Sequence, residues 1–96
     1  PSTAYQLTPP VDFRAAVDLL GDDHLIVDSE RMLVIFRKGV LNLEVVEGDL
    51  ESAEQVTIKV LDSSPQAGET ENTLVERFLE QVKTTTETDW AEVHNT

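Results

Sequence analysis

Few side chains in this sequence are of the types that do chemistry. The two histidines, His24 and His94, lie far apart in the chain, and there is no cysteine. The run Asp22-Asp23-His24 contains donor atoms that could bind a metal. One histidine beside two adjacent carboxylates, however, lacks the ligand spacing of a defined metal site. A polar turn is the better interpretation of this cluster.

Two other kinds of site are equally unsupported. Asp49, Glu51 and Glu54 follow a glycine, but they do not form the calcium-loop pattern of alternating oxygen ligands with a distal glutamate. The four glycines are scattered, as turn glycines are, so there is no glycine-rich loop to bind phosphate. The sequence therefore predicts a non-enzymatic protein with no catalytic residues, no cofactor and no bound metal.

The charge is the strongest deviation in composition, because nineteen acidic residues oppose seven basic ones and give a net charge of −12. This excess disfavours direct binding to nucleic-acid backbones or anionic lipid, both of which attract basic surfaces. Three interpretations remain open. The acidic surface keeps the protein soluble, or it is an adaptation to high salt, consistent with only three lysines, or it is functional. A functional acidic surface would complement a basic partner or imitate a phosphate backbone.

The location is expected to be cytoplasmic. No apolar run approaches the roughly 18–20 residues that span a bilayer, and no basic-then-apolar leader is present. The length predicts one α+β domain over residues 1–96, with flexible arms at 1–8 and 87–96.

Four short runs rich in β-branched and large apolar residues predict the centre of the fold. Each run ends in a polar or glycine-containing turn, which is typical of an antiparallel meander. In the first run Leu25 and Val27 are expected to point inward. Gly39 is expected to supply positive φ in a Lys38-Gly39 hairpin turn. The four strands are predicted over residues 24–29, 31–37, 40–46 and 55–61.

Two helices are predicted on either side of this meander. The first, over 9–20, begins at Thr8-Pro9-Pro10, where proline is tolerated. The second, over 73–84, begins with a capping-box pair, Thr73 and Glu76. Residues 49–54 suit either a short helical turn or an acidic loop, and 62–72 read as a long loop.

Packing both helices on one face of the meander predicts a two-layer sandwich. The other face is then too apolar for simple solvation, so another molecule, a helix, or the long loop and the tail with Trp90 must cover it. Arginine and lysine side chains rim this face, as at an interaction patch. The predicted partner-binding residues are Arg31, Leu33, Ile35, Arg37, Val40, Val46, Lys59 and Leu61.

Three functions are consistent with these expectations. The leading one is a small acidic protein-interaction module, either an adaptor or chaperone-like protein or a homodimer, which binds another protein or itself through the apolar sheet face. The second is a small-ligand or lipid carrier with a cavity between helices and sheet, lined by Phe13, Phe36, Phe78 and Leu79. The third is an acidic nucleic-acid mimic that inhibits a basic protein.

Two family resemblances accompany these hypotheses. The span Arg31–Val60, with LVIFRKGVLNLEV before a VTIKV strand, is similar in texture to the sheet of sterol-carrier-like lipid-binding domains. The later helices that complete a pocket in that family are missing here. The order of elements also resembles small acidic secretion chaperones, which dimerise, although this chain is shorter and has fewer elements. Neither resemblance assigns a role to any residue.

Overall fold

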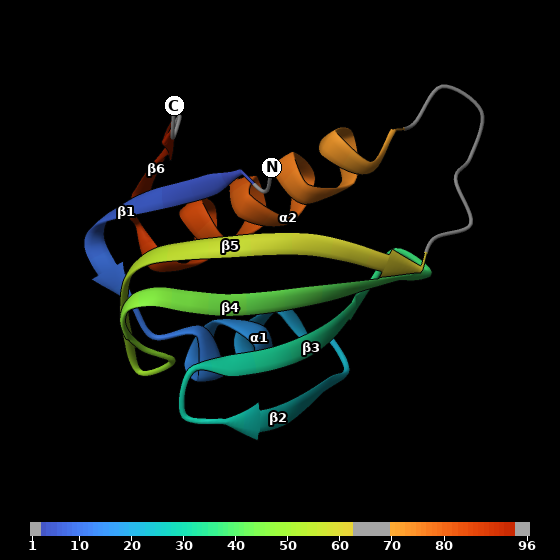
Figure 1. The fold of residues 1–96 in the computed structure, drawn as a ribbon, viewed down its shortest axis with the longest axis horizontal. Helices are drawn as coiled ribbons and strands as arrows, with labels where there is room; N and C mark the ends of the chain where they lie inside the picture. The colour runs from blue at the N-terminus through green and yellow to red at the C-terminus, as the bar shows by residue number, and fades with distance from the viewer. Residues whose placement is uncertain (1–2, 63–69, 94–96) are drawn as a thin grey trace.

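The computed structural model describes residues 3–62 and 70–93, and within them one antiparallel sheet is flanked by two helices (Figure 1). The sheet has six strands in the order β2-β3-β4-β5-β1-β6. In chain order the elements are β1 (Ala4–Val11), α1 (Phe13–Leu20), β2 (His24–Asp28), β3 (Arg31–Phe36), β4 (Gly39–Asp49), β5 (Ser52–Asp62), α2 (Glu71–Thr86) and β6 (Asp89–Val93).

The predicted α+β class is confirmed, but the four-stranded two-layer arrangement is wrong. The four expected strands are present as β2 to β5, each antiparallel to the next. Strands β1 and β6 extend this meander beyond β5, and this end of the sheet bends toward α2 (Figure 1).

The first helix begins four residues later than predicted, at Phe13, and the segment before it is a strand. The side chain of Asp12 caps α1 by accepting a hydrogen bond from the Ala15 backbone N–H at 3.0 Å. Pro9 and Pro10 lie where the pairing of β1 with β5 is interrupted, so their missing N–H groups leave no gap in that ladder. The proline pair therefore marks an irregular strand end and not a helix start.

The C-terminal segment, expected as a flexible arm, forms the edge strand β6. It pairs with β1 in a regular antiparallel register from Thr8↔Asp89 to Ala4↔Val93. The Thr88 side chain is buried and donates a hydrogen bond to the Pro9 carbonyl oxygen. These contacts fix the segment, and they also place residues 4–8 of the other predicted arm in the sheet. Residues 94–96 lie outside the described part of the chain.

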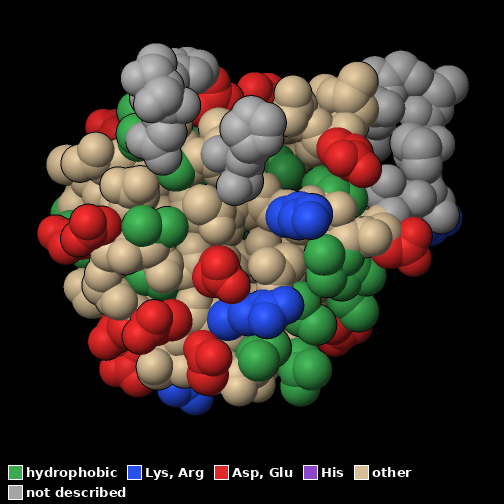
Figure 2. Space-filling view, viewed as in Figure 1, with side chains coloured by type: hydrophobic (Ala, Val, Ile, Leu, Met, Phe, Trp, Pro, Cys, Tyr) green, Lys and Arg blue, Asp and Glu red, His purple; other side chains and the backbone are tan. Residues whose placement is uncertain are grey.

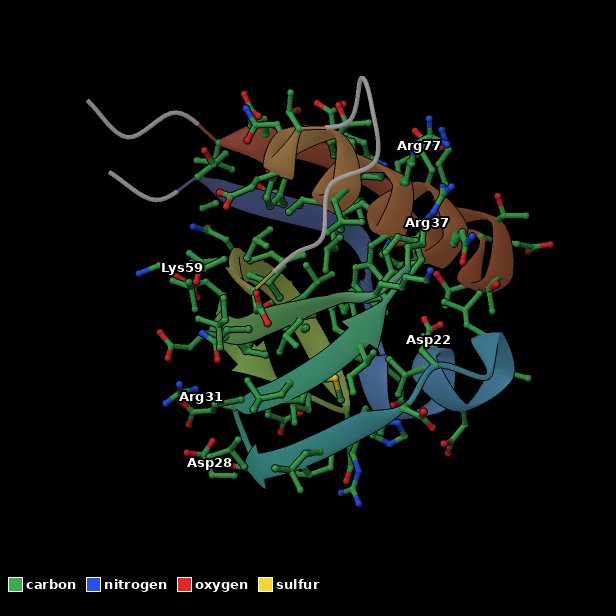
Figure 3. All side chains as sticks on the ribbon, turned by 90° about the vertical axis from the view of Figure 1, so that its right-hand side faces the viewer. Asp22, Asp28, Arg31, Arg37, Lys59 and Arg77 are labelled. Carbon is green, nitrogen blue, oxygen red and sulfur yellow. The ribbon has the colours of Figure 1, made fainter. Side chains whose placement is uncertain are left out.

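Both helices pack on the same face of the sheet and close the core there (Figures 1 and 3). Helix α2 spans 71–86 because Thr70, and not Thr73, is its N-cap. Its Phe78 contacts Phe36 edge to face, with ring centroids 5.5 Å apart. The other large side chains with less than 2% exposure are Val11, Phe13, Val17, Met32, Val34, Leu41, Leu43, Leu50, Val56, Leu79 and Val82.

Strand β2 faces the opposite way from the prediction. Ile26 pairs with Met32 and packs against the core, whereas Leu25 pairs with Leu33 and is 62% exposed. Val27 is exposed as well. Residues 25–27 are all apolar, so either face of this strand could be buried, and the pairing with β3 selects Ile26.

The two hairpin turns also differ from expectation. Arg37 and Lys38 have the positive φ values, 50° and 69°, and Gly39 begins β4. Strands β4 and β5 are joined by a two-residue turn, Leu50-Glu51, instead of a helical turn or loop at 49–54. Leu50 is buried, and its carbonyl oxygen accepts a hydrogen bond from the Phe13 N–H. Most of the predicted loop, residues 63–69, lies outside the described residues.

Candidate interaction surface

The face of the sheet opposite the helices, called here the outer face, contains most of the predicted site. Strand register places it directly: on β3, Arg31, Leu33 and Ile35 lie opposite β4 residues Glu44, Asn42 and Val40. Lys59 on β5 lies opposite Asn42. These pairs form the middle of the face, which also includes Leu25, Val27, Val46, Thr57 and Leu61.

Several large apolar side chains on the outer face are about half exposed or more. The exposed fractions are 62% for Leu25, 51% for Ile35, 53% for Val46 and 49% for Leu61. Leu33 and Val40 are half-buried. No helix or strand of the described residues packs over this face, because both helices lie on the other side (Figure 3). Neighbouring exposed apolar residues of this kind mark interaction sites in many proteins.

The tail does not cover this face, contrary to one of the expected arrangements. Trp90 pairs with Leu7 on β1 and contacts the Tyr5 ring edge to face at 5.7 Å. Tyr5 pairs with Val56 and belongs to the core, so Trp90 lies on the helix side. Of the three covers considered, the helices and the part of the tail that the structure describes are therefore ruled out.

Arg37 does not lie with the other predicted residues. Seven of the eight, from Arg31 to Leu61, lie on the outer face, but Figure 3 shows Arg37 on the helix side of the sheet. Strand alternation would have placed Arg37 with Arg31 and Ile35. The strand ends at Phe36, however, and the positive φ of Arg37 turns its side chain toward α2.

The polar groups of the outer face form a small mixed-charge cluster. Arg31 Nε donates a hydrogen bond to Asn42 Oδ1 at 2.7 Å and lies 4.0 Å from Glu44 Oε1. Lys59 is exposed, and within the described part of the chain it has no hydrogen bond or ion pair. Figure 2 shows two basic side chains near the middle of this face, with hydrophobic side chains gathered to their right.

Four functional candidates were missed at the sequence level. Leu25 and Val27 were assigned to the core, and Asn42 and Glu44 were assigned to the correct face but not to the site. The signal for Asn42 and Glu44 was their position on β4 opposite Leu33 and Arg31. For β2 only the pairing with β3 distinguishes the two faces.

The Asp22-Asp23-His24 cluster is a structural turn. His24 Nδ1 lies 3.0 Å from the Asp22 carbonyl oxygen, and Nε2 lies 3.9 Å from Asp18 Oδ1. Burial and the nearby Asp23 carboxylate raise the pKa of Asp22, and His24 lowers it by a smaller amount. Among the described residues, no three side chains of the metal-binding types are grouped closely enough to hold an ion.

The residues proposed to line a carrier cavity are packed against other side chains. Phe13, Phe78 and Leu79 are fully buried, and Phe36 is 2% exposed. The edge-to-face contact between Phe36 and Phe78 occupies the space between sheet and α2. These four residues therefore contribute to the hydrophobic core, and their geometry offers no support for a bound lipid.

Comparison of the chain with protein-family models, curated proteins and solved structures gives no match. In the described residues, neither helix has the length and apolar character needed to cross a membrane.

Proposed function

We propose that this protein is a non-enzymatic interaction module that binds a protein partner through the outer face of its sheet. The observation that carries the proposal is the exposure of Leu25, Ile35, Val46 and Leu61 on a face that no described helix or strand covers. Leaving such surface in water is unfavourable by about 25 cal/mol per Å², and a partner that covers it recovers this free energy. We place the interaction in the cytoplasm.

The polar cluster supports the same proposal. Interfaces combine a hydrophobic centre with polar groups that fix orientation. Arg31, Asn42 and Lys59 lie in adjacent strands next to the apolar residues, as this arrangement requires. The hydrogen bond from Arg31 to Asn42 holds the guanidinium over the sheet, so its position is set before a partner arrives.

Site-specific photo-crosslinking tests the proposal because it captures whichever protein contacts the labelled position. A photoreactive residue replaces Ile35 on the outer face in one variant and Leu19 on α1 in the other. Leu19 is a matched control because it is apolar and 72% exposed but belongs to a helix on the opposite side of the sheet. We expect a discrete crosslinked protein product in cells from position 35 and not from position 19.

A glutamate substitution gives the complementary experiment. Ile35→Glu should abolish the product formed from a crosslinker at position 33, because it buries a carboxylate at the centre of the contact. Leu19→Glu should leave that product unchanged, and circular dichroism should show both variants folded. Equal products from positions 35 and 19, or no product from position 35, would contradict the proposal.

A further inference from the structure

We infer that the partner of the outer face is a second copy of this chain, stacked face to face about a two-fold axis. Lys59 of each copy then lies against Glu44 of the other. This inference rests on the proposed function and names its partner.

Charge distribution favours self-association at this face. The chain carries a net charge of −12, so two copies repel each other over most of their surface. On the outer face, two basic residues, Arg31 and Lys59, lie among three acidic ones, Glu44 in the middle of the sheet and Asp28 and Asp62 at its edges, so the charge of this face is much closer to balance than that of the whole chain. Two copies therefore repel each other less at this face than their net charges suggest. A strongly charged partner of either sign would meet no excess of the opposite charge here.

The positions of the two charges suit a symmetric contact. Lys59 pairs with Asn42, and Glu44 pairs with Thr57, so Lys59 and Glu44 are diagonal neighbours on β5 and β4. A two-fold axis that lies in the contact plane, passes through their midpoint and is perpendicular to the line joining them exchanges their positions. Each dimer then contains two identical Lys59–Glu44 pairs, as an isologous interface requires. Glu44 is available for this role because its side chain is 56% exposed and its contact with Arg31 within the same copy is long, at 4.0 Å.

The same axis aligns the apolar part of the face. With neighbouring strands about 4.8 Å apart and a rise of about 3.4 Å per residue, the axis runs from the Lys59–Glu44 midpoint toward Leu33. Leu25 and Ile35 lie on opposite sides of this axis, so Leu25 of each copy then meets Ile35 of the other. Stacked sheets pack about 10 Å apart, which leaves room for these side chains to interdigitate.

A charge-swap experiment tests this arrangement. Sedimentation equilibrium over a concentration series should show a wild-type dimer. Lys59→Glu and Glu44→Lys should each weaken dimerisation about tenfold, because each reverses two symmetry-related pairs. An equimolar mixture of the two single variants should form heterodimers at least as strong as the wild-type dimer, and the double variant K59E/E44K should recover dimerisation. Lys83→Glu, the same charge change on α2, is the control and should leave dimerisation unchanged, although it removes the 3.7 Å ion pair between Lys83 and Asp89.

Three outcomes would overturn the inference. The wild-type chain could remain a monomer at every concentration, both single variants could dimerise like the wild type, or their mixture could fail to assemble. A monomer whose position 35 crosslinks a different protein would refute the second copy and leave the proposed function intact. Absence of both the dimer and the crosslink would refute both.

Discussion

Gly39 lies directly against the side chain of Leu74, so that a Cβ atom at position 39 would come within 2.7 Å of Leu74 Cδ2. This close approach fixes the start of β4 against the N-terminal half of α2. The reason for glycine here is space and not φ, because the positive φ angles of the turn belong to Arg37 and Lys38.

Gly39→Ala should lower the free energy of unfolding by about 1–3 kcal/mol, since the methyl group must displace Leu74 and overpack the core. Gly48→Ala should cost more. Gly48 has a φ of +95°, and its Cβ would collide with the Ser52 carbonyl oxygen, a backbone atom that cannot move aside. Urea unfolding of both variants measures the difference, and an equal loss in both would contradict this explanation.

Lys38→Gly should raise the free energy of unfolding by about 0.5–1 kcal/mol. Lys38 has a φ of +69°, a left-handed conformation that costs a residue with a Cβ about 1–2 kcal/mol. Part of that gain is offset by the greater backbone entropy of glycine in the unfolded chain. Lys59→Gly removes the same side chain from an extended strand and should destabilise the protein. Stabilisation by both substitutions, or by neither, would show that turn strain is unimportant.

Asp22→Asn should stabilise the protein at neutral pH, by less than about 1 kcal/mol because the side chain is only partly buried. The pKa of Asp22 is raised above its usual value of 3.8, chiefly by burial. The folded protein therefore binds this proton more tightly than the unfolded chain does. The resulting penalty is absent below pH 3.8 and develops as pH rises through the folded-state pKa.

Thermal unfolding at a series of pH values checks this prediction. The difference between Asp22→Asn and wild type should grow as pH rises from 3.8 toward neutrality and then become constant. Asp12 and Asp49 are not suitable controls because their carboxylates accept backbone hydrogen bonds. Asp23→Asn serves instead. It should have a smaller effect because it removes only the repulsion from the Asp23 carboxylate, which raises the pKa of Asp22 less than burial does. A difference that does not vary with pH would contradict the assignment.

Salt should stabilise the fold if the acidic surface is an adaptation to high ionic strength. Repulsion among nineteen carboxylates is strong in dilute buffer and is screened at about 1 M salt, where the Debye length is roughly 3 Å. The thermal midpoint should therefore rise between 0.05 M and 1 M potassium chloride. The variant E76Q/E80Q, with two fewer carboxylates on exposed positions of α2, should show a smaller rise. An unchanged midpoint in wild type would exclude this interpretation.

The central strands could be predicted because their residues alternate over long runs between buried and exposed environments. Strand β5 is an example. Val56, Ile58 and Val60 alternate with Thr57 and Lys59, so only one orientation of the strand turns the apolar side chains toward the core. Strand β2 offers no such contrast, and which of its side chains point toward the core depends on which residue pairs with Met32. Local patterns carry no information about that pairing.

The two strands beyond β5 in the sheet, β1 and β6, could not be predicted for a different reason. Strand β6 spans only Asp89–Val93, and β1 contains Pro9 and Pro10, which resemble a helix start. Both depend on pairing with strands distant in the sequence, β1 with β5 and β6, and β6 with β1, and not on their own composition. The prediction for Arg37 was wrong for a third reason. The alternation of β3 ends at Phe36, and the sequence does not predict the positive φ angles of the turn that follows.

The pairing of Ala4 with Val93 determines how this domain would respond to force. The two strands that lead into and out of the described structure are antiparallel neighbours, and their outermost residues are cross-strand partners. Tension applied at these residues would load the backbone hydrogen bonds between β1 and β6 one after another, as in a zipper, and not all together as in shear. Strand β6 should therefore peel away at low force while the four-stranded meander stays folded. The same geometry means that a short peptide linker could join the two strands, which makes the domain a candidate for circular permutation.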